Sequence, residues 1–213
     1  MVKVAGKKAG AVSTEAGSKK KSKKSKGEEF NTLDASLSRY IKVWDEALPE
    51  EYCQKMISHY AEAGEYQIAR SDGGLFVSCN IDRPTQFQKA SETQKKIIEA
   101  TLPVYADLTK PHPNSLPEQS VLEDTHIYHF RNENDHKEIG IDVAHIAQAR
   151  RYLTLIWFLS DDPDFYLKFT DLGAKVESRA GRLLMFPSTW TYPYEIRNGS
   201  KQNYLLKTHL NFI

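Results

Sequence analysis

The second half of the chain is a succession of short strand patterns, and this feature constrains the fold most strongly. The runs are rich in β-branched and aromatic residues and are separated by turn signals such as Asn-Gly. They cover residues 121–130, 152–159, 166–169, 174–177, 182–186 and 203–212. Residues 152–159 are apolar at nearly every position. This run therefore predicts a central strand that is covered on both faces.

Helical patterns precede the strands. Pro49 and Gly64 enclose apolar residues at helical spacing, which predicts a helix between them. Ser91 and Gln94 form a capping-box pattern for a second helix, which we expect Pro103 to end or kink. Helices followed by many short strands predict an α+β domain, in which the helices pack on a β-sandwich or jelly roll.

Charge is distributed unevenly along the chain. The net charge of the whole chain is +1, but residues 1–26 hold nine lysines and one acid, a charge of +8. The rest carries 20 basic and 27 acidic residues, a charge of −7. Residues 1–29 contain no aromatic residue, and we expect a disordered basic arm there. Residues 30–213 are expected to form one domain, with helical support over 40–110 and core strands over 121–213.

The basic arm has two interpretations. It can contact nucleic acid or another acidic surface non-specifically, because lysines near phosphates release counterions. It can equally be a solubilising tail. No stretch approaches the ~20 apolar residues that span a bilayer, and no secretory signal is visible. The two cysteines, Cys53 and Cys79, are expected to be buried thiols in a reducing compartment. We therefore expect a protein that is neither secreted nor membrane-bound.

Several segments resemble the 2-oxoglutarate/Fe(II) dioxygenases, in particular their prolyl-4-hydroxylase-like branch, which is common in phages and algal viruses. Residues 150–161 resemble the second core strand of that family, and residues 181–188 resemble the strand before the distal metal histidine. Residues 204–212 resemble the closing strand, and residues 48–53 the first helix. The resemblance covers residues 121–213 well and 40–108 loosely. It implies a double-stranded β-helix (jelly-roll) core with N-terminal helices packed on it.

The resemblance also implies where Fe(II) ligands should lie. The family uses two imidazoles and one carboxylate. Asp142 falls at the carboxylate position, but Gly140 stands at the first histidine position. The second histidine position falls on Tyr192, or on Tyr194 with a shift of two residues. Tyrosine, with a pKa of about 10, is a poor ligand for Fe(II) at neutral pH. We therefore expect a vestigial site that has lost iron, with no cofactor bound.

The 2-oxoglutarate positions are only partly matched. The resemblance places the base that pairs with 2-oxoglutarate at Lys201 or Asn203, and it brings Tyr128 into contact with the same molecule. An alternative active site would use His136, Glu138 and one further histidine for iron and Lys201 for 2-oxoglutarate, although a lone histidine is more often structural. If the site is active, its cofactors are Fe(II) and 2-oxoglutarate.

These observations leave three functional hypotheses. The first is a non-catalytic structural or binding module with a protein partner, cytoplasmic or virion-associated, and nucleic-acid-associated through its arm. The second is an active dioxygenase of the prolyl-hydroxylase type with an unusual ligand set. The third is a small-molecule binder in which Lys201 anchors an acid. The aromatic group Trp190, Tyr192 and Tyr194 either fills the barrel mouth or forms a surface for a partner.

Overall fold

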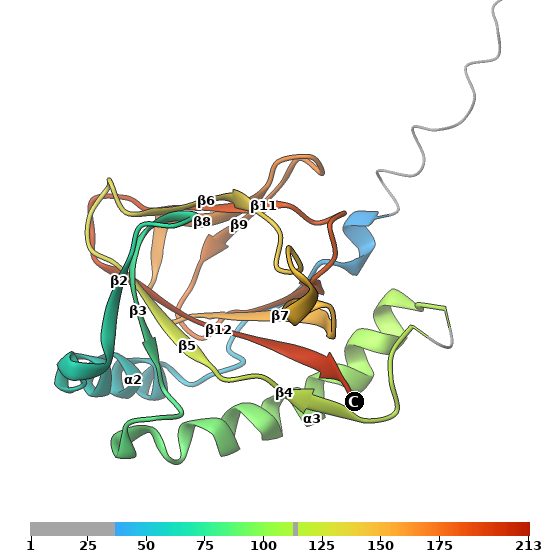
Figure 1. Cartoon of the computed structure of the whole chain (residues 1–213), viewed down its shortest axis with the longest axis horizontal. Coiled ribbons are helices and arrows are strands. Elements are labelled where there is room, and N and C mark those ends of the chain that lie inside the picture. The colour runs from blue at the N-terminus through green and yellow to red at the C-terminus, as the bar shows by residue number, and fades with distance from the viewer. Residues whose placement is uncertain (1–36, 113–114) are drawn as a thin grey trace, which may run out of the picture. The chain divides into compact units, whose positions relative to one another are not determined.

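The structure is a computed structural model that describes residues 37–112 and 115–213 (Figure 1). The predicted basic arm, residues 1–29, lies outside the described residues. Contacts divide the chain into two units, residues 1–30 and 31–213, and every element below belongs to the second. Among the described residues, no helix is both long and apolar enough to cross a lipid bilayer.

The first half of this unit contains the two predicted helices. Helix α2 begins directly after Pro49, as expected, because the fixed φ of proline suits a helix start. The chain then forms a hairpin of two strands around a glycine turn. The elements are 3-10 turn η1 (Ser38–Tyr40), β1 (Lys42–Trp44), α2 (Glu50–Glu62), η2 (Gly64–Tyr66), β2 (Gln67–Arg70), β3 (Gly74–Asn80), η3 (Thr85–Phe87) and α3 (Ala90–Thr109).

Helix α3 differs from the prediction at both ends. The predicted capping box of Ser91 and Gln94 is wrong, since Lys89 precedes the helix and Gln94 is fully buried. The helix also continues past Pro103 to its end at Thr109. Buried residues beyond the proline, such as Tyr105, hold the last turns against the core. Tertiary packing therefore outweighs the hydrogen bond that proline removes.

The second half is built from strands, as predicted. Residues 121–130 form two strands rather than one, and β6 and β11 were not predicted. The residues of β6 lack a clear hydrophobic alternation, and those of β11 alternate over only four positions. The elements are β4 (Ser120–Leu122), β5 (His126–Phe130), β6 (His136–Gly140), η4 (Ile146–Gln148), β7 (Arg151–Phe158), β8 (Asp162–Phe169), β9 (Ala174–Ser178), β10 (Leu183–Pro187), β11 (Tyr194–Arg197) and β12 (Asn203–Phe212).

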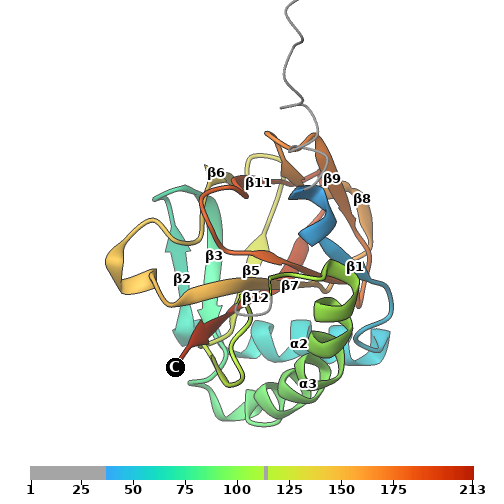
Figure 2. The ribbon, with the colours of Figure 1, turned by 90° about the vertical axis from the view of Figure 1, so that its right-hand side faces the viewer.

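The strands form two facing sheets that β3 joins (Figures 1 and 2). The strand order is β1-β10-β7-β12-β5-β3 in the larger sheet and β6-β11-β8-β9 in the smaller one, with all pairs antiparallel. Strand β3 pairs with β5 along most of its length and with β6 at Gly74 and Leu75. The fold is therefore the predicted α+β arrangement, a double-stranded β-helix with helices packed on it.

Strand β7 divides the hydrophobic core into two parts. Leu155 and Trp157 pack in a cluster with side chains of α2 and α3, on the outer face of the larger sheet. Ile156 and Phe158 point the other way, into a cluster between the two sheets. Both clusters exclude water, so the predicted central strand with two covered faces is confirmed. The two cysteines are buried free thiols, as expected.

Candidate functional site

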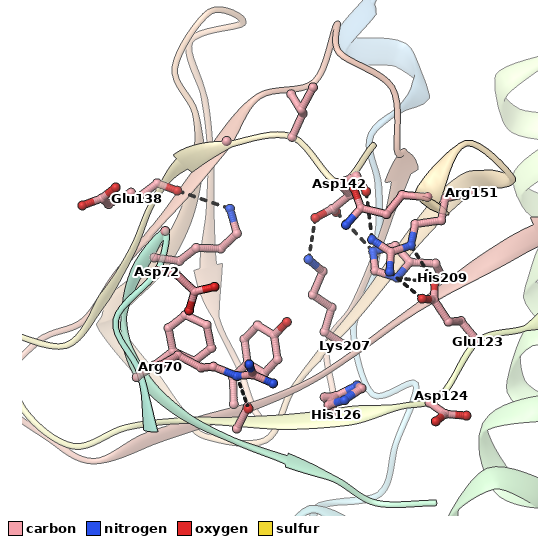
Figure 3. Close-up of a pocket in the computed structure, with 18 of the residues that line it drawn as sticks. Arg70, Asp72, Glu123, Asp124, His126, Glu138, Asp142, Arg151, Lys207 and His209 are labelled. Atoms are coloured by element: carbon pink, nitrogen blue, oxygen red, sulfur yellow. Dashed lines mark hydrogen bonds and ion pairs between the residues drawn. The ribbon is translucent and has the colours of Figure 1, made fainter. Parts of the chain in front are cut away.

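A cavity of about 460 Å³ opens between the two sheets, and charged side chains line much of it. Its walls come from the β2–β3 hairpin, from β5, β6 and β12, and from the segment that links β6 to β7. Figure 3 shows Lys207 pointing from β12 toward Asp142 in the middle of this cavity. These two residues form the chemical centre of the site.

Asp142 is buried and surrounded by donors. Its carboxylate lies 2.5 Å from Lys207 Nζ, and it accepts hydrogen bonds from Thr154 Oγ1 at 2.7 Å and from the Tyr194 hydroxyl at 3.0 Å. Burial by itself would raise the pKa of Asp142. The charge of Lys207 and contacts with His209 instead hold that pKa well below its usual range. Asp142 is therefore a buried carboxylate that stays ionised.

Lys207 is the matching cation. It lies on the inward face of β12, opposite His126 of β5 and Ile156 of β7, and its side chain is 6% exposed. Burial would lower its pKa, but the neighbouring Asp142 carboxylate raises it above the ordinary value. Lysine is almost never fully buried without a partner. The Lys207–Asp142 pair is therefore a buried ion pair at the centre of the barrel.

A second group of charges supports this pair. The Arg151 guanidinium donates to both oxygens of Glu123, at 2.7 and 2.5 Å, and to the backbone carbonyl of Asp142 at 2.9 Å. His209 lies between the two carboxylates, with Nδ1 3.1 Å from Glu123 and Nε2 3.5 Å from Asp142. Burial would raise the pKa of Glu123, but hydrogen bonds from His209 and Arg151 lower it to about 2. Positive and negative groups alternate through the network.

The residues present do not match the ligand set that Fe(II) needs. That set is two imidazoles and a carboxylate arranged around one point. In the described part of the chain, no group of three or more His, Cys, Asp or Glu side chains is placed to hold a metal ion. Lys207 Nζ donates a hydrogen bond to one carboxylate oxygen of Asp142, and Gly140 has no side chain that could bind a metal. An ammonium group therefore lies beside the Asp142 carboxylate, where Fe(II) binding would need open coordination positions.

The two tyrosines at the predicted second histidine position lie in different surroundings. Tyr194 of β11 pairs with Gly140 of β6. If the second histidine position is Tyr194 rather than Tyr192, the two histidine positions that the resemblance implies therefore lie opposite each other. The hydroxyl of Tyr192 instead donates to the carbonyl of Leu37 at 3.1 Å, away from Asp142. The structure thus places Tyr194, the alternative position, against the carboxylate.

The predicted 2-oxoglutarate base does not reach the cavity. Lys201 is exposed in the turn before β12, and Asn203 is buried, where its amide donates to Asp162 and Asn198. Neither lines the cavity, whereas Lys207 does. Tyr128 does line it, and its ring stacks on Phe76 with 4.6 Å between centroids. Contact of Tyr128 with 2-oxoglutarate stays a prediction.

The structure does not join His136 and Glu138 into a site. Glu138 lines the cavity, but His136 does not, and His136 Nδ1 lies 2.8 Å from the Asn134 carbonyl.

The aromatic residues Trp190, Tyr192 and Tyr194 do not lie together in one surface. Trp190 is 75% exposed, while Tyr192 and Tyr194 are buried. Those two tyrosines pack in the cluster between the sheets, and Trp190 is not part of it.

Sequence reasoning missed the roles of Lys207, Lys137 and Glu123. One signal for Lys207 was present, because it alternates with His209 on one face of an otherwise apolar closing strand. Lys137 lines the same cavity, with Nζ 4.2 Å from the centroid of the Tyr194 ring. Burial and the nearby Lys207 charge lower the pKa of Lys137 to about 8. No local pattern marked Lys137 or Glu123.

Comparison with solved structures identifies the fold. A viral collagen prolyl hydroxylase from Paramecium bursaria Chlorella virus-1, in complex with 2-oxoglutarate, is 12% identical with a TM-score of 0.60, covering 82% of this chain and 97% of its own. A prolyl-4-hydroxylase from Pseudomonas putida is 13% identical with a TM-score of 0.60, covering 86% and 98%.

A third similar structure is a prolyl hydroxylase from Trichoplax adhaerens, in complex with a hypoxia-inducible-factor peptide fragment. It is 11% identical with a TM-score of 0.58, covering 84% of this chain and 89% of its own. No protein-family model and no curated protein sequence matches the chain. The chain therefore has the fold of the prolyl hydroxylases among the 2-oxoglutarate/Fe(II) dioxygenases, as the sequence resemblance implied.

Proposed function

We propose that this protein is a non-catalytic binding module, which keeps the dioxygenase barrel and uses the buried Lys207 ammonium in place of the metal cation. The observation that carries the proposal is the Lys207–Asp142 ion pair, in which both side chains are almost fully buried. In this proposal the lysine neutralises the carboxylate that would otherwise attract a divalent cation.

The polar surroundings support the same proposal. Tyr194 and Thr154 donate to Asp142, so hydrogen bonds satisfy its oxygens without a metal. Burial and the neighbouring Asp142 charge raise the pKa of Tyr194 well above its ordinary value, so this tyrosine stays neutral at physiological pH. A neutral phenol is a poor ligand for Fe(II). Binding iron here would require the ion pair to break and leave a buried lysine unpaired.

An anaerobic titration with Fe(II) and 2-oxoglutarate tests this proposal. We expect no visible metal-to-ligand charge-transfer band and no iron retained after desalting, whereas an iron-dependent prolyl hydroxylase treated in parallel should show both. Near-ultraviolet circular dichroism would establish that the protein remains folded during the titration.

A band at stoichiometric iron would contradict the proposal. It would favour the alternative function, an active dioxygenase of the prolyl-hydroxylase type with an unusual ligand set. Asp142→Asn and His136→Ala would then separate the two candidate sites, because only the variant of a true ligand should lose the band.

The proposed partner of the arm is nucleic acid or another acidic surface, in the cytoplasm or in a virion. The proposal rests on the charge of +8 in residues 1–26 against −7 in the rest of the chain. We expect weak, sequence-independent DNA binding whose log–log salt slope has a magnitude of at most about 8, since each phosphate contact contributes about 0.9. A variant lacking residues 1–29 should lose this binding in a fluorescence-anisotropy titration. Equal affinity with and without the arm would exclude this role.

A further inference from the structure

A side pocket of about 220 Å³ adjoins the cavity beside strands β2, β3 and β5. Arg70, Ser78 and His126 line both the pocket and the cavity, so the two spaces meet at these residues. In the view of Figure 3, Arg70 and His126 lie below Lys207, whereas Asp142 lies above it. The pocket is therefore a branch of the cavity that lies apart from the predicted metal site.

Positive groups outnumber negative groups in this side pocket. Its lining contains the guanidinium groups of Arg70 and Arg83 and the imidazole of His126, against the single carboxylate of Glu65. In the part of the chain that the structure describes, no ion pair joins either guanidinium to a carboxylate. The pocket thus has positive charge that the protein itself does not neutralise, which favours an anionic ligand.

A buried hydroxyl holds the Arg70 side chain in place. Arg70 Nε donates to Ser78 Oγ at 2.9 Å, and Ser78 is 2% exposed. The terminal N–H groups of this guanidinium have no hydrogen-bond partner among the described residues. A guanidinium presents its donors as a rigid fork that matches an oxyanion. Arg70 can therefore bind an anion with little further loss of conformational freedom.

The loop that carries Arg83 is fixed to the start of β5. The Asp82 carboxylate accepts a hydrogen bond from the Thr125 amide at 2.8 Å, and the Asp82 amide donates to Asn80 Oδ1 at 2.9 Å. These contacts set the backbone next to Arg83, whose exposed side chain lines the pocket. A second guanidinium therefore reaches the pocket from an anchored loop.

We propose that the side pocket binds the phosphate group of a small phosphate monoester, whose remaining atoms occupy the adjoining cavity. Such a phosphate carries a charge of about −2 and three terminal acceptor oxygens, which two guanidinium forks can satisfy together. A carboxylate has one charge and two oxygens, so it would leave one of the two cations without a partner. The cavity of about 460 Å³ has room for the body of the ester. This inference rests on the proposed function in one respect, that the cavity binds a ligand.

A nuclear magnetic resonance titration tests the site directly. The Nε–H signals of the arginines of the full chain are followed while phenyl phosphate is added in the presence of EDTA, and single Arg→Gln variants assign the signals. Arg150 is the matched control, because it is exposed and lines neither the pocket nor the cavity. We expect the signals of Arg70 and Arg83 to shift together along one saturating curve, while the Arg150 signal stays in place.

Variants and comparison ligands make the result decisive. Arg83→Gln should weaken the binding of phenyl phosphate about tenfold, measured on the Arg70 signal, because a charged hydrogen bond is lost. Arg150→Gln should leave the affinity unchanged. Benzoate lacks the phosphate and inorganic phosphate lacks the ester body, so each should bind about tenfold more weakly than phenyl phosphate. The lysine-rich arm is present in every variant, so anion binding to it cannot produce these differences.

Three results would overturn the inference. They are equal shifts of all three arginine signals, an affinity that Arg83→Gln does not change, and equal affinity for phenyl phosphate and either comparison ligand. No iron takes part in this titration, so its failure would leave the proposed loss of iron binding untouched. A charge-transfer band in the iron titration would contradict the proposed function whatever the phosphate result.

Discussion

Replacing Lys207 by methionine should lower the free energy of unfolding by about 3–5 kcal/mol, measured by urea denaturation at pH 7. Methionine fills much of the same space but removes the ammonium, so Asp142 becomes a buried carboxylate without its cation. Both side chains of the pair are at most 6% exposed. Water therefore cannot screen the uncompensated charge, and most of its desolvation cost appears as lost stability.

The same experiment has an internal control. Adding Asp142→Asn to Lys207→Met removes both charges, and we expect this double variant to recover most of the lost stability. The double-mutant cycle should give a coupling energy of at least about 2 kcal/mol, because each single variant leaves one buried charge unpaired. Additive losses would show that the two side chains contribute independently, and would remove the basis for treating Lys207 as a substitute cation.

Gly181→Ala should be the most disruptive backbone substitution that we consider, with a loss of at least about 3 kcal/mol. Gly181 has φ of +81°, and an added Cβ would lie 2.1 Å from the Leu48 carbonyl oxygen. Gly181 also donates to the Phe158 carbonyl and accepts from the Leu48 amide. An alanine would therefore force apart the turn before β10 and the segment that leads into α2.

Gly173→Ala is the matched control for this prediction. Gly173 also has a positive φ, +61°, but nothing lies within 4 Å of its added Cβ. We expect only the conformational cost of about 1–2 kcal/mol there. Similar losses for the two variants in parallel urea denaturation would mean that the contact with Leu48 relaxes easily, so that it does not hold the N-terminal segment on the barrel.

Under the proposed function, the fold is kept while the chemistry of the site changes. A barrel that closes on a buried carboxylate needs a cation nearby, and an ammonium can balance the charge as a metal can. What the ammonium cannot supply is a set of open coordination positions for a co-substrate and oxygen. The function is thus argued from Lys207, Asp142 and Tyr194, and the fold alone does not decide it.

Much of the fold follows from local patterns in the sequence. The apolar run of β7 predicted a strand with two buried faces, and the pattern over residues 203–212 predicted the strand β12. The same reasoning predicted α2 from its helical spacing and Pro49. It missed β6, which has no clear alternation, and β11, which is only four residues long. It also allowed α3 to end at Pro103, whereas the helix continues to Thr109.

The site itself depended on the tertiary structure. The sequence marked Asp142 through its resemblance, and alternation put Lys207 and His209 on one face of the last strand. The register between β6 and β11 and the closure of the two sheets decided which side chains Asp142, Lys207 and His209 contact. Lys207 is 65 positions away from Asp142 in the chain. A local pattern encodes which face of a strand is buried, whereas the partner of a buried charge is set only when distant strands come together.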